Sequence, residues 1–274
     1  MVLTKHILNQ YFKQVTAVAM LGFLGLAFSG DVAANNGDTL NRYDDQGKMH
    51  GYWMRSNNGV LTYEGRFDHG TPTGLFVYYY PDRSIKSTMY YSDQGRDAKT
   101  VMFHQNGSIM AIGKYYDREK DSTWRYYNEY EIQVSSEEYV RGKPHGVWKK
   151  YNMRGQVIEK HNYVDGVKHG EWLQYFDNGK LKLRATYVDG FLQGRFMMYF
   201  SNDLPSVSGL YERSIPVGVW LYYNIHGKIE RKVHYENGVR AKIEHLVPFV
   251  EPDSPEALEE VRNFRRQLRN MGLE

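Results

Sequence analysis

Five histidines that each precede a glycine are the first residues in this sequence that could do chemistry. They are His50, His69, His145, His169 and His226. Imidazole nitrogens bind metal ions, but a metal site also needs further His, Asp or Glu ligands at matching spacing. We find no such pair at ligand spacing within any one repeat of the chain. We therefore expect these histidines to lie in tight turns, and we predict no metal site.

The sequence contains no recognisable catalytic motif. It has no G-x-S-x-G elbow, no phosphate-binding P-loop and no H-E-x-x-H zinc motif. Asp165 and Asp189 each precede a glycine, and Asp-Gly pairs are typical of turns rather than of catalytic carboxylates. The chain has no cysteine, which excludes disulfides, thiolate metal sites and cysteine nucleophiles. We therefore predict a protein that is not an enzyme and that needs no cofactor.

Aromatic side chains recur at a fixed spacing of 24 residues. One column is aromatic at every step: Phe67, Tyr91, Tyr115, Tyr139, Tyr163, Tyr187, Tyr211 and Tyr235. A second column holds Trp53, Trp124, Trp148, Trp172 and Trp220, with Phe76, Thr100 and Phe196 at the intervening steps. Rows of Trp and Tyr form hot spots in protein interfaces and also stack on sugar rings. We expect the first column to form the structural core. The five tryptophans are the candidate partner-binding residues, with burial in the core as the alternative.

The composition indicates which elements carry these columns. The 274 residues include 24 Tyr and 26 Gly, and the mean hydropathy is -0.65. Tyr and Gly at these levels in a polar chain are typical of short strands joined by tight turns. Glycines expected in turns follow the first strand of each unit: Gly59, Gly107, Gly155, Gly179 and Gly227. The net charge is only +3, with no basic cluster, so we expect no nucleic-acid partner.

The segment 170–190 shows how one unit folds. Two strands, residues 171–176 and 180–188, flank Asn178-Gly179, which predicts a type I′ hairpin turn. Trp172 and Tyr175 are three residues apart and so point to opposite faces of the first strand. We expect an all-β, elongated antiparallel array of about eight such hairpins. A closed four-bladed propeller made of paired units is the alternative.

Units three and four depart from the pattern. Thr100 replaces the aromatic residue of the tryptophan column, and Arg118 and Glu131 stand where turn glycines are expected. We expect a dent, a bulge or a register slip at this point of the array.

The two ends of the chain differ from the array. Residues 1–34 resemble a cleavable signal peptide, because the uncharged run 15–28 is shorter than the roughly 20 residues of a membrane span. Cleavage near Ala34 would export the protein to the periplasm or the extracellular space, with an uncleaved anchor as the alternative. We expect an N-terminal capping strand in 35–50, the repeat array in 51–240, and a degenerate strand and an amphipathic helix in 241–274. Ser254 and Pro255 are typical of a helix start, and we expect this helix, which runs to about Met271, to cover the last sheet edge, with partner docking as the alternative.

The motif G-x-W-x-x-Y, with its following Gly and Y-x-x-G, is clearest in residues 146–166, 170–190 and 218–238. It resembles the MORN-repeat variant, found in proteins named as YwqK-type antitoxins of toxin–antitoxin systems. The resemblance covers about residues 43–240. It implies a β-hairpin array that serves as a scaffold for protein or lipid interactions.

We therefore expect an exported, non-enzymatic scaffold that binds another protein, an envelope component or a toxin, along its aromatic sheet surface. An antitoxin or immunity-type inhibitor is one alternative. A module that binds an envelope glycan or a lipid surface is another.

Overall fold

The computed structural model describes residues 40–246 together with Glu259, Arg262 and Arg266. Residues 42–245 form a single antiparallel sheet of 20 strands, within the unit Asn41–Glu274. The first ten strands are β1 (Arg42–Tyr43), β2 (Met49–Asn57), β3 (Val60–Asp68), β4 (Thr71–Tyr79), β5 (Ile85–Ser92), β6 (Asp97–Phe103), β7 (Ile109–Tyr116), β8 (Glu119–Tyr127), β9 (Gln133–Val140) and β10 (Lys143–Pro144). The remaining ten are β11 (Gly146–Tyr151), β12 (Val157–Val164), β13 (Val167–Tyr175), β14 (Leu181–Val188), β15 (Phe191–Leu192), β16 (Gly194–Tyr199), β17 (Pro205–Glu212), β18 (Ile215–Tyr223), β19 (Ile229–Glu236) and β20 (Val239–His245).

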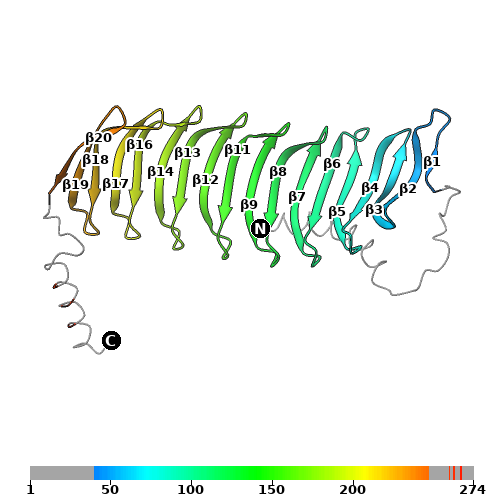
Figure 1. The fold of residues 1–274 in the computed structure, drawn as a ribbon, viewed down its shortest axis with the longest axis horizontal. Helices are drawn as coiled ribbons and strands as arrows, with labels where there is room; N and C mark the ends of the chain where they lie inside the picture. Colours follow the sequence, from blue (N-terminus) through cyan, green and yellow to red (C-terminus); the bar gives the residue numbers. More distant parts are fainter. Residues whose placement is uncertain (1–39, 247–258, 260–261, 263–265, 267–274) are drawn as a thin grey trace, which may run out of the picture. The chain divides into compact units, whose positions relative to one another are not determined.

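The strands follow one another along the sheet in chain order (Figure 1). Each strand pairs antiparallel with the next, as β2 with β3 and β18 with β19. Two strands are each split in two by one residue: β10 and β11 both pair with β9, and β15 and β16 both pair with β14. β1 pairs with β2 and β20 with β19, so these two short strands form the edges. The sheet is therefore open, and the propeller alternative is wrong.

The hairpin turns are of more than one type. In the turn Phe176–Gly179, the Gly179 N–H donates to the carbonyl of Phe176 at 2.9 Å, and Gly179 has φ of 82° whereas Asn178 is not in the left-handed region. A type I′ turn needs positive φ at both central residues, so the expected type I′ turn at Asn178-Gly179 is wrong. The type I′ pattern occurs instead at Asp165-Gly166, with φ of 48° and 90°, where Val164 pairs with Val167. The five predicted turn glycines, Gly59, Gly107, Gly155, Gly179 and Gly227, all have positive φ.

Aromatic side chains on one face of the sheet form the core. Three clusters are centred on Trp53 with Phe76, on Trp124 and on Trp220. Of the 24-residue column expected to be core, Phe67 and Tyr139 are buried and the other six are half-buried against the same clusters or their neighbours. A single-layer sheet has no second layer to complete the burial, so neighbouring rings must cover one another.

Glycines on the adjacent strand allow the largest rings to lie flat on the sheet. Gly65, Gly113 and Gly209 lie beneath Phe76, Trp124 and Trp220, and a Cβ atom at any of the three would overlap the ring above it. In the third unit the sizes are exchanged, because Met89 stands at the glycine position and is paired with the small Thr100, which is 1% exposed. The small side chain of Thr100 therefore compensates for the larger side chain of Met89 on the adjacent strand.

A β-bulge precedes the aromatic residue in most units. The bulge places a residue at positive φ two positions before the ring, as at Gly74, Ser122 and Gly218. Ala98 occupies this position in the third unit without positive φ, and β5 and β6 pair there in unbroken register. The dent, bulge or slip expected at units three and four is therefore wrong: the third unit lacks the bulge that most units have because alanine disfavours the left-handed region, and Arg118 and Glu131 adopt positive φ in place of glycine.

Several expectations for the two ends lie outside the described residues. These are the signal peptide in residues 1–34 and most of the helix expected from Pro255 to about Met271. Glu259, Arg262 and Arg266 have helical backbone and are exposed. No helix among the described residues is long and apolar enough to cross a membrane.

Candidate binding surface

Trp148 and Trp172 each lie on the opposite face of the sheet from the tyrosine three residues after it, as the spacing predicts for Trp172 and Tyr175. Trp148 and Trp172 share their face with Glu159, whereas Tyr175 lies with Lys160 on the other, where the Lys160 ammonium is 5.8 Å from the ring centroid. On that second face the Tyr151 hydroxyl also lies 3.2 Å from the Ser136 hydroxyl. The two faces therefore offer different chemistry, and the tryptophan face carries the three aromatic clusters.

The five tryptophans predicted to bind a partner fall into two groups. Trp53, Trp124 and Trp220 are buried, at 9%, 0% and 5% exposure. The indole N–H of Trp124 donates to the carbonyl of Lys114 at 3.0 Å, which ties the ring to the sheet. These three rings belong to the core, and their expected role in partner contact is not supported. Trp148 and Trp172 are half-buried and remain candidates.

A polar group separates the two remaining tryptophans. His161 on β12 pairs across the sheet with Trp148 on β11 and with Trp172 on β13. His161 stands at the step of the repeat that holds Gly113 and Gly209 in other units, so no flat platform is available for Trp172. The rings of His161 and Trp172 stack on each other instead, with centroids 5.5 Å apart and planes 13° apart.

Glu159 is the hydrogen-bond centre of this region. Its carboxylate accepts from Lys150 Nζ at 2.7 Å, from Trp172 Nε1 at 3.1 Å and from Gln174 Nε2 at 3.0 Å. Burial alone would raise the pKa of Glu159, but the donors, Lys150 first, outweigh it and lower the pKa to about 2. Glu159 is therefore a fixed negative charge at neutral pH.

The ring of His161 completes this group. Its Nε2 lies 3.2 Å from Glu159 Oε1, and burial together with the charge of Lys168 lowers the pKa of His161. The neutral imidazole donates from Nε2 to Glu159, which leaves Nδ1 as an acceptor, and this buried atom has no hydrogen-bond partner among the described residues. We call Trp148, Glu159, His161, Trp172 and Gln174 the β11–β13 patch.

Tyrosines of the 24-residue column border the patch. Tyr163 contacts Trp148 with centroids 4.8 Å apart, and Tyr187 contacts Trp172 at 5.9 Å. Lys168 lies over Tyr187, with its ammonium 5.0 Å from the ring centroid. Burial raises the pKa of both tyrosine hydroxyls, so they stay protonated. Such a surface of rings, one carboxylate and hydrogen-bonding groups is suited to binding, because its carboxylate is too strongly paired to act as a base.

Sequence reasoning missed Glu159, His161 and Gln174. The available signal was the repeat step that holds Gly65, Gly113 and Gly209, which is Glu137 in one unit and His161 in the next. Glu137 and His161 are the two consecutive polar residues at a step that otherwise holds Gly, Ala, Val or Met, and they mark the place where the core packing changes.

Comparison with known proteins identifies the repeat. Residues 168–189, the hairpin of β13 and β14, match the family model of the MORN repeat variant. No protein of curated function matches the chain.

Solved structures give distant likenesses. One is a crystal structure of a TarM mutant from S. aureus in complex with fondaparinux, alpha-GlcNAc-glycerol and UDP, at 14% identity and a TM-score of 0.27 over 35% of this chain and 19% of that chain. Another is the GtfA/B complex, at 15% identity and a TM-score of 0.23 over 34% of this chain and 18% of that one. This chain spans less than a fifth of either protein.

Proposed function

We propose that this chain, whose repeating unit is a MORN variant, is an exported, non-enzymatic scaffold that binds a protein partner through the β11–β13 patch. The observation that carries the proposal is the half-burial of Trp148 and Trp172 beside a fixed carboxylate, in a row where the other three tryptophans are buried. Tryptophan is enriched in interface hot spots, where a large ring is combined with a hydrogen-bonding group.

The charge of the patch favours a partner that offers donors. Glu159 is negative and its side chain is 14% exposed, while its ion-pair partner Lys150, on the rim, is 66% exposed. His161 Nδ1 is buried and so is not open to a partner. A partner that presents an arginine or an amide could bind the Glu159 carboxylate and stack on the two tryptophans. Transfer of such a side chain from water onto the rings of Trp148 and Trp172 would concentrate the binding free energy in a small area of the interface.

Site-specific photo-cross-linking tests the proposal. A photoreactive side chain replaces Gln174, on the patch, or Lys160, on the opposite face of the same strands, and cells that export the protein are irradiated. We expect one adduct of defined mass from position 174 and none of that mass from position 160. The same adduct from both positions, or no protein adduct at 174, would overturn the proposal.

The mass of the adduct also separates the classes of partner. An envelope protein supports the scaffold role, and a toxin identifies an antitoxin or immunity-type inhibitor of the kind that the YwqK-type resemblance implies. If only glycan or lipid is captured at position 174, the patch is a glycan- or lipid-binding surface and the protein-scaffold proposal fails.

A further role is proposed for the C-terminal residues 255–271. The edge strand β20 has backbone groups that no described strand pairs, and an amphipathic helix over this edge would prevent addition of further strands. Removal of residues 251–274 should then promote self-association, which analytical ultracentrifugation would detect; a truncated chain that stays monomeric would contradict the capping role.

A further inference from the structure

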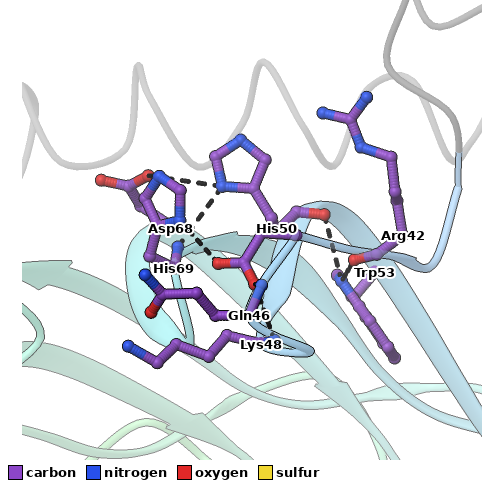
Figure 2. A network of polar contacts seen from close by, with 8 residues as sticks. Arg42, Gln46, Lys48, His50, Trp53, Asp68 and His69 are labelled. Atoms are coloured by element: carbon purple, nitrogen blue, oxygen red, sulfur yellow. Dashed lines mark hydrogen bonds and ion pairs between the residues drawn. The ribbon is translucent and has the colours of Figure 1, made fainter.

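Two histidines and an aspartate meet at the first hairpin of the array. His50 lies on β2, Asp68 is the last residue of β3, and His69 follows in the turn to β4. The antiparallel register of β2 and β3 brings residues that are 18 and 19 positions apart to the same end of the hairpin. The rings of His50 and His69 have centroids 4.6 Å apart and planes 39° apart. Figure 2 shows the three side chains converging beside the turn.

The nitrogen and oxygen atoms of this cluster have the separations of metal ligands. Asp68 Oδ1 lies 3.5 Å from His50 Nδ1 and 3.8 Å from His69 Nε2, and the three residues each offer one ligand atom within 4.8 Å of those of the other two. Ligands at tetrahedral angles around Zn²⁺, with bonds of about 2.1 Å, are roughly 3.4 Å apart. The two separations from Asp68 are within a few tenths of an ångström of this value, and rotation of the exposed side chains would bring the two histidine nitrogens to the same ion.

A fourth residue holds His69 in the state that a metal requires. His69 Nδ1 donates to Asp44 Oδ2 at 2.6 Å, and the Asp44 side chain is only 9% exposed. The other oxygen of Asp44 accepts the backbone N–H groups of Gln46 and Lys48 at 2.8 Å each, so the carboxylate cannot turn away. A carboxylate behind a histidine ligand is the arrangement that orients imidazole in metal sites.

These hydrogen bonds leave acceptors facing one another. With the proton on Nδ1, His69 presents a lone pair from Nε2 toward the oxygen of Asp68. His50 Nδ1 also accepts, from the His69 backbone N–H at 3.3 Å, so it presents no proton to Asp68. Three acceptors thus converge with a single, long donor among them. A cation would bind all three if His50 Nδ1 exchanged its long hydrogen bond with the His69 N–H for a bond to the ion.

Other units show the same turn without the second histidine. His145 lies 3.7 Å from Asp165 and His169 lies 3.5 Å from Asp189, each next to an Asp-Gly turn. The turn positions that hold Asp68 and His69 in the first hairpin hold a valine and an aspartate there. Within the described range, the first hairpin alone combines three such ligands.

We propose that His50, Asp68 and His69 form a binding site for a divalent transition-metal ion, with Zn²⁺ as the representative ion, and that Asp44 positions His69. Water would fill the fourth place, since Asp68 and His69 are 67% and 64% exposed. The ion would join the β2–β3 hairpin to the turn 44–48 beside β1, and so fasten the N-terminal edge of the array.

Metal titration of the untagged, full-length protein tests the site. After treatment with chelator, Zn²⁺ is added in a calorimeter, and Co²⁺ is added while its visible absorption is recorded. We expect one Zn²⁺ per chain and the intense absorption of tetrahedral Co²⁺. The variant D68N should weaken Zn²⁺ binding at least tenfold, and D44N should weaken it by about tenfold, the lower end for loss of a carboxylate behind a ligand.

The control is H145A, which removes a histidine from an equivalent turn and should leave Zn²⁺ binding unchanged. Circular dichroism spectra of all variants verify that the sheet is intact, and the wild-type Co²⁺ spectrum tests the site without any substitution. Failure of the wild-type protein to bind one Zn²⁺ per chain, an octahedral Co²⁺ spectrum, or equal loss in D68N and H145A would overturn the proposal.

Discussion

Replacement of Gly113 by alanine tests the packing of rings on glycine. Gly113 is not in the left-handed region, so alanine would ordinarily stabilise the strand there by about 0.5–1 kcal/mol. The Cβ atom would, however, overlap the ring of Trp124, which is 0% exposed. Overpacking costs about 1–3 kcal/mol, and displacement of the indole from the Lys114 carbonyl adds about 1 kcal/mol. We expect G113A to lower the free energy of unfolding by about 2–3 kcal/mol.

A double substitution supplies the control from the chain itself. Met89 paired with Thr100 is the natural solution in the third unit, so G113M combined with W124T reproduces that pair in the fourth. W124T alone should cost about 3–5 kcal/mol, because it removes a buried ring. The loss in free energy of unfolding in the double variant should be smaller than the sum of the losses in the two single variants, by at least about 2 kcal/mol.

Urea unfolding followed by tryptophan fluorescence measures these differences. Hydrogen exchange then locates them, because neighbouring units in a repeat array are affected more than distant ones. We expect faster exchange in β7 and β8 than in β17 and β18 for G113A. A G113A protein as stable as the wild type, or additive effects in the double variant, would refute the packing of the ring on the glycine.

Two further predictions concern single residues. Ser122 has φ of 59°, so S122G should stabilise the protein by about 1 kcal/mol in urea unfolding. Ala98 is at the equivalent position without positive φ, so A98G should destabilise the protein by about 0.5–1 kcal/mol. Effects of the same sign would contradict the role of the bulge. The pKa of Glu159 is about 2 when folded and near 4.5 when unfolded, so its stabilising contribution is complete above about pH 4.5 and is lost as the pH falls toward 2. The urea midpoint of E159Q should therefore fall less than that of the wild type between pH 5 and pH 3, and equal slopes would contradict the pairing with Lys150.

The repeat could be predicted from the sequence because it depends on local rules. Period-2 alternation, glycines at turns and the three-residue spacing of Trp172 and Tyr175 define the hairpins and their two faces. Glycine at positions such as Gly179 correctly indicated positive φ. The predicted turn type was wrong, because an Asn-Gly pair can occupy the two central residues of a type I′ turn or the last two residues of another turn.

The contacts between strands could not be predicted in the same way. The partner of Trp124 lies 11 residues before it, and this pairing depends on a β-bulge that changes the register. Thr100 was therefore interpreted as a departure from the repeat, and its pairing with Met89 was not predicted. His50 and His69 likewise seemed to belong to separate units, because their contact requires the register of β2 and β3 to be known.

The affinity of patch variants for the cross-linked partner tests the central claim most directly. Dissociation constants are measured for the wild type, W172A, W148A and K160A, after circular dichroism shows that each is folded. Removal of a hot-spot tryptophan costs about 2 kcal/mol or more, so we predict that W172A and W148A each bind at least about tenfold more weakly, while K160A, on the opposite face, binds as the wild type does. Unchanged affinity in both tryptophan variants, or an equal loss in K160A, would contradict binding through the β11–β13 patch.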